Sequence, residues 1–304
     1  MTSIKALQQT LEQLNHIILG KDHAIKLALS CMLARGHLLI DDLPGMGKTT
    51  LSHALASTLD LSYQRIQFTS DLLPSDLLGV NIYDRNSGQF EFHQGPIFSQ
   101  VVLADEINRA SPKTQSALLE AMEEGQVTIE GKTRPLPSPF FVIATQNPSE
   151  QAGTFPLPES QLDRFMMRIS LGYPGAEAEK QLLKGKSRRD LLATLKAQIS
   201  QESLIKIQGL VSLVTASDSI IDYVYRLTLF SREQLERSNG LSPRAAMALL
   251  QAAKAWALLD GRNHLLPDDI QAIFPYVAEH RISPDALGLD HPLSERILAS
   301  VDIF

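Results

Sequence analysis

The segment Gly45-Met46-Gly47-Lys48-Thr49 contains the residue types that bind phosphate groups. Small residues let successive backbone N–H groups surround an anion where a helix begins. A lysine can then reach the β and γ phosphates, and a threonine hydroxyl can ligate magnesium. The usual motif begins with a glycine, and this chain has Asp42 in that position. By itself the segment fits either a nucleotide site or a glycine-rich turn before an ordinary helix.

Asp42 does not exclude a nucleotide site. Only the later loop positions, from Gly45 to Thr49, bring backbone N–H groups to phosphate, whereas the first position ends the preceding strand and its side chain can point away. We therefore expect an aspartate to be tolerated there. The predicted nucleotide contacts of the loop are Pro44, Gly45, Met46, Gly47, Lys48, Thr49 and Thr50.

Two carboxylates follow a second hydrophobic run, because Val101 to Ala104 is succeeded by Asp105 and Glu106. An acid at the tip of a strand can hold the hydration shell of magnesium, and the next acid can polarise an attacking water. These are the two acidic roles that hydrolysis of a nucleoside triphosphate needs. The alternative is a strand that leaves the core through a solvated acidic loop, and the glycine-rich loop upstream makes that alternative weaker.

Three further polar residues are candidates for the same chemistry. Asn147 follows the run Phe141 to Thr145 and fits either a γ-phosphate contact or an Asn-Pro turn. Arg164 lies near the end of a predicted helix over residues 158–165, where it can also simply complement the helix dipole. Arg244 follows Ser242-Pro243 at the start of a helix, where a cation opposes the dipole; it fits either a nearby anion such as phosphate or an exposed arginine whose position costs little.

These residues require a parallel sheet to position them. Strands are predicted at 37–40, 63–68, 101–104, 140–145 and 166–170, alternating with helices, which indicates a sheet covered on both faces. Two hairpins are expected near 80–93 and 126–137, the second with a Gly131-Lys132 turn. After Gly172 the pattern is helical. The predicted domains are therefore an α/β nucleotide-binding domain, residues 1–173, and an all-α domain, residues 174–304.

Composition limits the class of protein. The 304 residues are 44% hydrophobic and 20% charged, which indicates a globular chain. The net charge of -6 disfavours a general nucleic-acid binder. The longest mostly apolar run, residues 27–34, is far shorter than the ~20 residues of a membrane span, so no membrane insertion and a cytoplasmic location are expected. The single cysteine, Cys31, fits a buried apolar position, and no zinc-type cluster is visible.

In chain order, the motifs resemble one known family. They are the glycine-rich loop, ADEINRA (104–110), FVIATQNP (141–148), QLDRF (161–165) and LSPRA (241–245). Together they resemble an AAA+ ATPase of the MoxR family, in the helix-2-insert clade, from about Leu14 to the C-terminal helices. The resemblance implies a P-loop NTPase core of parallel sheet and flanking helices followed by an all-α lid domain, with ATP and Mg²⁺ as cofactors.

The resemblance also implies a role for each motif residue. Lys48 and Thr49 become the Walker A residues, and Asp105 and Glu106 the Walker B pair. Asn147 becomes sensor 1, Arg244 sensor 2, and Arg164 the arginine finger that reaches a neighbouring subunit's nucleotide. Ile18, Leu19 and Gly20 are expected near the adenine, and Arg109 is a second candidate for acting between subunits. The two hairpins match the helix-2 insert and the hairpin before sensor 1.

Resemblance to MoxR proteins implies a homo-oligomeric ring, commonly a hexamer. It also implies that the ring drives chaperone-like maturation of protein clients, including metal or cofactor insertion. A separate partner with a von Willebrand factor A domain is expected by the same analogy. Three alternatives stay open at this point: the ATPase motor of a metal chelatase, a nucleic-acid motor, and a scaffold that binds ATP without hydrolysing it.

Overall fold

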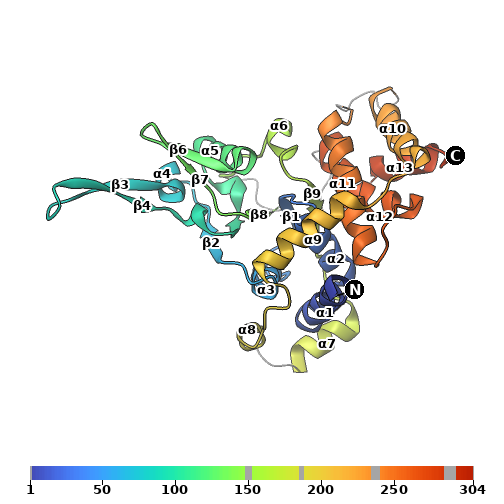
Figure 1. Cartoon of the computed structure of the whole chain (residues 1–304), viewed down its shortest axis with the longest axis horizontal. Helices are drawn as coiled ribbons and strands as arrows, with labels where there is room; N and C mark the ends of the chain where they lie inside the picture. The colour runs from blue at the N-terminus through green and yellow to red at the C-terminus, as the bar shows by residue number, and fades with distance from the viewer. Residues whose placement is uncertain (1, 148–152, 185–187, 234–239, 284–291, 304) are drawn as a thin grey trace.

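A five-stranded parallel sheet forms the centre of the α/β part of the protein (Figure 1). The computed structural model describes residues 2–147, 153–184, 188–233, 240–283 and 292–303. The strand order is β2-β5-β8-β1-β9, and every neighbouring pair is parallel. The strands are β1 (Leu38–Asp41), β2 (Tyr63–Gln67), β5 (Val101–Asp105), β8 (Phe141–Gln146) and β9 (Met167–Ile169). This is the predicted fold class.

Strand side chains alternate between two separate cores. In β1, Leu38 and Ile40 enter one core while Leu39 enters the other. The central strands β5 and β8 divide in the same way, because successive residues of a strand point to opposite faces. Both faces of the sheet are thus buried, which explains why these strands are continuous hydrophobic runs rather than alternating ones.

Helices cover each face of the sheet. The first core contains residues from α1 (Thr2–Ile17), α2 (Asp22–Leu33) and α3 (Lys48–Thr58). The second core contains residues from α4 (Pro74–Leu78), the 3-10 helix η1 (Pro96–Phe98), the 3-10 helix η2 (Ile107–Arg109), α5 (Pro112–Glu124) and α6 (Glu159–Leu162). Cys31 is buried in the first core with a free thiol, as predicted.

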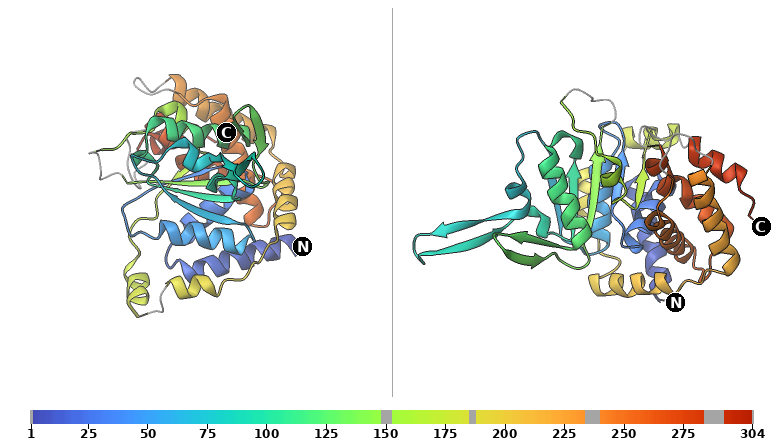
Figure 2. Two further views of the ribbon diagram at one scale, coloured as in Figure 1. Left: turned by 90° about the vertical axis from the view of Figure 1, so that its left-hand side faces the viewer. Right: turned by 90° about the horizontal axis from the view of Figure 1, so that it is seen from above.

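Beyond β9 the described chain is helical. The helices are α7 (Ala176–Lys184), α8 (Arg188–Ala193), α9 (Gln201–Leu213), α10 (Asp218–Glu233), α11 (Pro243–Leu259), α12 (Pro267–Ile282) and α13 (Pro292–Ser300). Helices α10 to α13 form the end of the molecule opposite the β3–β4 hairpin (Figures 1 and 2). No helix in the described ranges is long and apolar enough to cross a membrane. The domain boundary between residues 173 and 174 stays a prediction.

Two antiparallel hairpins extend from the core. The hairpin of β3 (Gly79–Asp84) and β4 (Gln89–Gln94) projects from the body of the protein (Figure 2). The hairpin of β6 (Gln126–Ile129) and β7 (Lys132–Pro135) turns at Glu130 and Gly131, so the predicted Gly131-Lys132 turn is wrong by one residue. Both turn residues have positive φ, 48° and 76°, which is the conformation of a type I′ turn.

The predicted helix over residues 158–165 is also too long. Helix α6 ends at Leu162, and the carbonyl oxygens of Asp163, Phe165 and Met166 accept hydrogen bonds from the Arg281 guanidinium on α12. A contact that joins residues more than a hundred positions apart leaves no local signal in the sequence. The short helices α4, α7 and α8 were likewise not predicted.

His37 holds the start of β1 to two other elements. Its Nδ1 accepts the backbone N–H of Val142 at 3.0 Å, so its Nε2 carries the proton and donates to the Met122 carbonyl at 3.2 Å. Loss of hydration lowers the pKa of His37 to about 4. The His37 ring therefore stays neutral in the folded protein down to about pH 4.

This burial predicts an acid-sensitive fold. In the unfolded chain histidine titrates near pH ~6.5, so between that pH and about 4 the unfolded state binds a proton that the folded state does not. Between pH 7.5 and 4 the free energy of unfolding should therefore fall by about 3 kcal/mol more in the wild type than in His37→Gln. Urea unfolding at pH 7.5, 6, 5 and 4 measures the difference, and parallel curves for the two proteins would refute it.

Candidate functional site

The glycine-rich loop connects β1 to α3 and leaves open space for a ligand. Gly45 and Gly47 have φ of +86° and +94°, a region that favours glycine, and a Cβ at either position would meet nothing within 4 Å. Lys48 is the first residue of α3. The backbone N–H groups of the first helical turn lack partners within the helix, so the loop and helix together form an anion-binding concavity.

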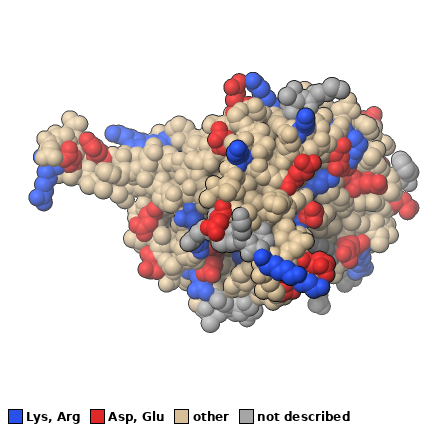
Figure 3. Space-filling view, turned by 90° about the horizontal axis from the view of Figure 1, so that it is seen from below, with Lys and Arg blue, Asp and Glu red and all other residues tan. Residues whose placement is uncertain are grey.

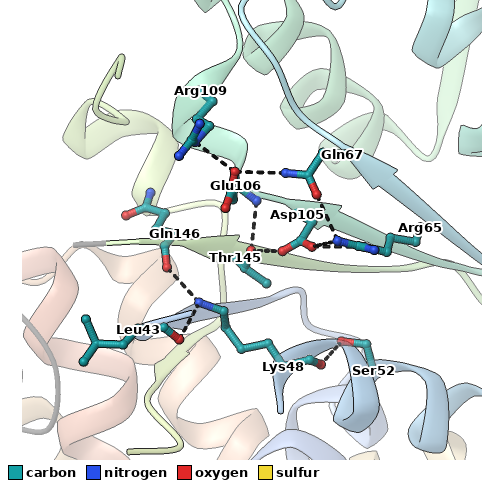
Figure 4. A network of polar contacts seen from close by, with 10 residues as sticks. All are labelled: Leu43, Lys48, Ser52, Arg65, Gln67, Asp105, Glu106, Arg109, Thr145 and Gln146. Carbon is teal, nitrogen blue, oxygen red and sulfur yellow. Dashed lines mark hydrogen bonds and ion pairs between the residues drawn. The ribbon is translucent and has the colours of Figure 1, made fainter. Parts of the chain in front are cut away.

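Lys48 points towards the carboxyl ends of the strands. Its Nζ donates to the carbonyl oxygens of Asp42, Leu43 and Gln146, the last two at 3.3 and 3.4 Å (Figure 4). Loss of hydration lowers the pKa of Lys48, and the nearby carboxylates, Asp42 first, oppose that shift. The ammonium group is thus held by neutral carbonyls in a place where a phosphate would be a stronger partner.

The carboxylate of Asp105 is fixed by two neighbouring strands. Its Oδ2 accepts from Arg65 Nη2 at 2.6 Å and Nε at 3.0 Å, and its Oδ1 accepts from the Thr145 hydroxyl at 2.6 Å. Arg65 comes from β2 and Thr145 from β8, which lie on either side of β5 in the sheet. Parallel pairing therefore places an arginine and a threonine beside this acid.

Glu106 leaves the strand in a left-handed conformation, with φ of 58° and ψ of 50°. Its backbone N–H donates to the Thr145 hydroxyl at 2.9 Å. Its Oε2 accepts from Gln67 Nε2 at 3.0 Å and forms an ion pair with Arg109 Nε at 2.8 Å (Figure 4). Arg109, predicted as a second candidate for action between subunits, is here a partner of the acid in its own chain.

Two cavities lie on the two sides of the loop. A polar cavity of about 370 Å³ is lined by Pro44, Gly45, Gly47, Lys48, Thr49, Thr50, Arg65, Gln67, Asp105, Glu106 and Asn147. A mostly apolar cavity of about 210 Å³ is lined by Ile17, Ile18, Leu19, Lys21, Gly45, Met46, Gly47, Thr50, Pro174 and Leu182. A polar and an apolar cavity that share the same loop fit the two ends of a nucleotide, its phosphates and its base. We call the polar one the phosphate cavity.

Most of the predicted nucleotide residues therefore meet in one place, including Leu19. Gly20 is beside the apolar cavity, where a Cβ would come within 3.0 Å of the Ala178 side chain. Asn147 lies at the end of β8 in the polar cavity, and Pro148 of the same motif is outside the described residues.

Arg164 and Arg244 are not among the residues that line either cavity. Both pair with Glu123 of α5, Arg164 Nη2 with its Oε2 at 3.1 Å and Arg244 Nη2 with its Oε1 at 2.5 Å. Arg164 Nη1 also donates to the Leu119 carbonyl at 2.6 Å. The anion beside Arg244 is thus a carboxylate of the same chain, and we call these three charged residues the Arg164–Glu123–Arg244 cluster.

Sequence reasoning missed Arg65, Gln67, Thr145 and Glu123. The available signal was their place in the pattern, because Arg65 and Gln67 lie on the strand that pairs with the acidic strand, and Thr145 precedes the Gln146-Asn147 pair. Without the strand order, however, nothing in the sequence says which strand is adjacent to which.

Asp42 points away from the phosphate cavity, as expected, and has a structural role. Its Oδ2 accepts the backbone N–H groups of Leu171 and Gly172 at 2.6 and 2.8 Å. Lys21 Nζ donates to the carbonyls of Gly172 and Tyr173 at 2.9 and 2.6 Å. Asp42 and Lys21 together tie the segment that leaves the sheet to the nucleotide loop.

Asp42→Gly should therefore destabilise the protein without raising its nucleotide affinity. The substitution removes the acceptor of three backbone N–H groups, those of Leu43, Leu171 and Gly172, and each group left buried without a partner costs about 1–3 kcal/mol. Urea unfolding measures the loss, and Asp42→Asn, which keeps one acceptor oxygen, is the matched control with a smaller loss. An increase of nucleotide affinity by orders of magnitude in Asp42→Gly would show that the carboxylate obstructs the site.

The donor set suits magnesium that arrives with a nucleotide. Among the described residues, no group of three or more His, Cys, Asp and Glu side chains is placed to hold a metal ion. Mg²⁺ is commonly bound by one or two protein oxygens together with phosphates and water. The Thr49 hydroxyl and the Asp105 carboxylate, both lining the phosphate cavity, are oxygen donors of this type.

Comparison with known proteins agrees with the geometry. A family model described as "ATPase family associated with various cellular activities (AAA)" matches residues 37–167, and an AAA lid domain model matches residues 229–299. A crystal structure of a candidate ATPase from Cytophaga hutchinsonii superposes with a TM-score of 0.89 at 38% identity, over 99% of this chain and 95% of the other. The fold and site thus define an AAA ATPase, which uses ATP.

Two curated relatives specify the family. The chain is 47% identical over 276 residues to protein YeaC of Bacillus subtilis, covering 91% of this chain and 86% of the relative. It is 38% identical over 289 residues to "Chaperone MoxR1" of Mycobacterium tuberculosis, covering 92% and 76%. The chain belongs to the MoxR family of AAA ATPases.

Proposed function

We propose that this ATPase uses Mg²⁺-dependent hydrolysis to remodel protein clients, with an active site completed by a neighbouring subunit. The observation that carries the proposal is the separation of the charged residues into two groups. Lys48, Asp105 and Glu106 surround the phosphate cavity, whereas the Arg164–Glu123–Arg244 cluster lies outside it. Since phosphoryl transfer needs cations around the γ phosphate, arginines outside their own site are available to the site of another subunit.

Within one subunit, the proposed roles follow the contacts. Lys48 exchanges its carbonyl partners for the β and γ phosphates, and Asn147 contacts the γ phosphate or the water. Thr49 and Asp105 would hold Mg²⁺, which would neutralise negative charge on the phosphate oxygens. Glu106 polarises the attacking water. Before the water is bound, Gln67 and Arg109 fix the orientation of the Glu106 carboxylate.

Between subunits, Arg164 acts as the arginine finger and Arg244 as sensor 2 in the proposed assembly. Their side chains are 29% and 53% exposed, so both are accessible to another molecule. Each must leave Glu123 to do so, and a γ phosphate carries more negative charge than one carboxylate. A hexameric ring in the cytoplasm is the assembly that family resemblance favours.

The client is proposed to be a protein, by analogy with the relative named as a chaperone. The β3–β4 hairpin has the apolar side chains Ile82, Tyr83 and Phe90 exposed at 48%, 53% and 71%, which suits contact with polypeptide. A separate von Willebrand factor A domain protein is the proposed partner. Recovery of a large tetrapyrrole-binding subunit in a pull-down would instead favour the chelatase motor.

Charge distribution is the reason to prefer a protein client over a nucleic acid. On the face seen in Figure 3, Lys and Arg side chains are interspersed with Asp and Glu. The guanidinium carbon of Arg134, on the β6–β7 hairpin, lies 3.8 Å from the centroid of the Phe92 ring, so this cation packs against the other hairpin. Binding of single-stranded DNA with a steep salt dependence would contradict this preference.

The roles within a subunit predict a separation of binding from hydrolysis. Glu106→Gln should bind ATP with the wild-type affinity and lose hydrolysis by at least ~10²-fold, because only the group that activates water is removed. Lys48→Ala should lose ATP binding itself. Equilibrium binding of a fluorescent ATP analogue and phosphate release measure the two properties, and normal turnover by Glu106→Gln would refute the assignment. Addition of EDTA should abolish hydrolysis by the wild type.

Completion of the site between subunits predicts a rate that depends on concentration. Hydrolysis per subunit should rise with protein concentration and reach a plateau, with Glu106→Gln as the blank. Arg164→Ala should keep ATP binding and lower the plateau by about 10³-fold or more. Normal hydrolysis by Arg164→Ala would remove it as the finger and leave Arg109 as the candidate. A rate equal to the blank at every concentration would instead favour the non-hydrolysing scaffold or activation by a partner.

A further inference from the structure

Arg281, near the end of α12, is a buried arginine whose hydrogen bonds converge on one short segment. Its side chain is only 6% exposed. Nε donates to Asp163 Oδ1 at 2.6 Å, and Nη2 donates to the carbonyls of Asp163 and Phe165 at 3.3 and 2.8 Å. Nη1 donates to the Met166 carbonyl at 3.3 Å and to that of Val277. It also lies 3.0 Å from His280 Nε2.

The segment held in this way is the one that carries Arg164. Arg281 bonds to the residue before it, Asp163, and to the residue after it, Phe165, so the backbone of Arg164 is fixed from both sides. Arg164 lies beyond the end of α6 and before β9, where the local support is two turn hydrogen bonds, from the Arg164 N–H to the Gln161 carbonyl at 3.2 Å and from the Phe165 N–H to the Leu162 carbonyl at 3.0 Å. A guanidinium in the protein interior must also satisfy its hydrogen bonds, which makes the arrangement costly to disturb.

We propose that Arg281 is the positioning residue for Arg164, holding the turn of residues 163–166 so that the Arg164 guanidinium is presented to the nucleotide of a neighbouring subunit. This inference rests on the proposed function, which assigns Arg164 to that site. Because Arg281 belongs to helix α12 of the helical part and the turn belongs to the α/β part, Arg281 also makes the placement of Arg164 depend on where the helical part sits. Helix α12 packs directly on α6 and β9, so no intermediate element is needed.

The first test is the steady-state kinetics of Arg281→Lys. Lysine keeps the charge but lacks the planar fork that reaches several acceptors at once. Misplacement of a catalytic group by about 1 Å can cost ~10²-fold in rate. We therefore expect kcat to fall by about 10- to 100-fold while KM for ATP changes by less than about 3-fold, since the variant's own nucleotide cavity is intact. Asp163→Asn alters only one partner of the arginine and should lower kcat by a smaller factor. This variant replaces Arg281→Lys in the test if Arg281→Lys does not fold.

The decisive test mixes subunits. Lys48→Ala subunits do not bind nucleotide but present a normal Arg164, so an excess of them should restore hydrolysis by Arg281→Lys subunits. A mixture of Lys48→Ala and Arg164→Ala subunits is the benchmark, and its hydrolysis should be restored to the same extent. A double variant, Arg164→Ala with Arg281→Lys, should have the same kcat as Arg164→Ala alone. Arg262→Lys is the matched control: it alters another ion-paired arginine of the helical part, with Asp260 and Asp269 as partners, and should leave kcat unchanged.

A measurement without turnover tests the positioning directly. Cys31 is buried, so a nitroxide placed through Arg164→Cys labels one site. Its spectrum should show greater mobility when Arg281→Lys is added and no change with Arg262→Lys.

The outcomes separate the two proposals. If neither mixture is restored, Arg164 does not act between subunits, and both the assignment of Arg164 and this inference are overturned. If the Arg164→Ala mixture is restored but the Arg281→Lys mixture is not, the proposed function stands and Arg281 serves only the stability of its own subunit. Unchanged label mobility in Arg281→Lys would also overturn the inference.

Discussion

Parallel pairing of β1, β8, β5 and β2 is the constraint on which the rest of the site depends. Neighbouring parallel strands end at the same edge of the sheet, so the residues that follow them gather in one place. The glycine-rich loop follows β1, Glu106 follows β5 and Asn147 follows β8. A change in strand order would leave the same motifs in the chain and place them apart, because no local interaction joins them.

Charged groups in and around this site have polar or oppositely charged partners within the subunit. Lys48 contacts carbonyl oxygens, Asp105 pairs with Arg65, and Glu106 pairs with Arg109. A nucleotide therefore exchanges existing electrostatic contacts for new ones instead of meeting bare charges, which limits the cost of burying charged groups before it arrives. The same logic applies to the Arg164–Glu123–Arg244 cluster, in which one carboxylate engages two arginines at once.

The helical part, and the segment that leads to it, are joined to the sheet by two kinds of contact with different physical consequences. One apolar core extends from β1 through α2 to α11 and α12, which makes separation of the parts costly in buried area. Hydrogen bonds fix orientation rather than proximity. The N–H groups of Leu171 and Gly172 donate to Asp42, and Arg281 donates to the turn before β9. Apolar contacts hold the two parts together, and the polar ones determine how the segments at the site are aimed.

The sequence by itself determined the class of fold, most strands and long helices, the phosphate loop and the acidic pair, because these depend on local periodicity and on motifs of consecutive residues. It also indicated that the Asp42 side chain can point away from the phosphate loop, and the hydrogen bonds of that side chain with Leu171 and Gly172 agree. Only the tertiary structure decided that Arg65 and Gln67 face the acidic pair, that Glu123 engages both arginines, and that Arg281 bonds to the turn that follows α6. These contacts join residues distant in the chain, and their energies depend on strand order, burial and side-chain direction, none of which a linear pattern contains.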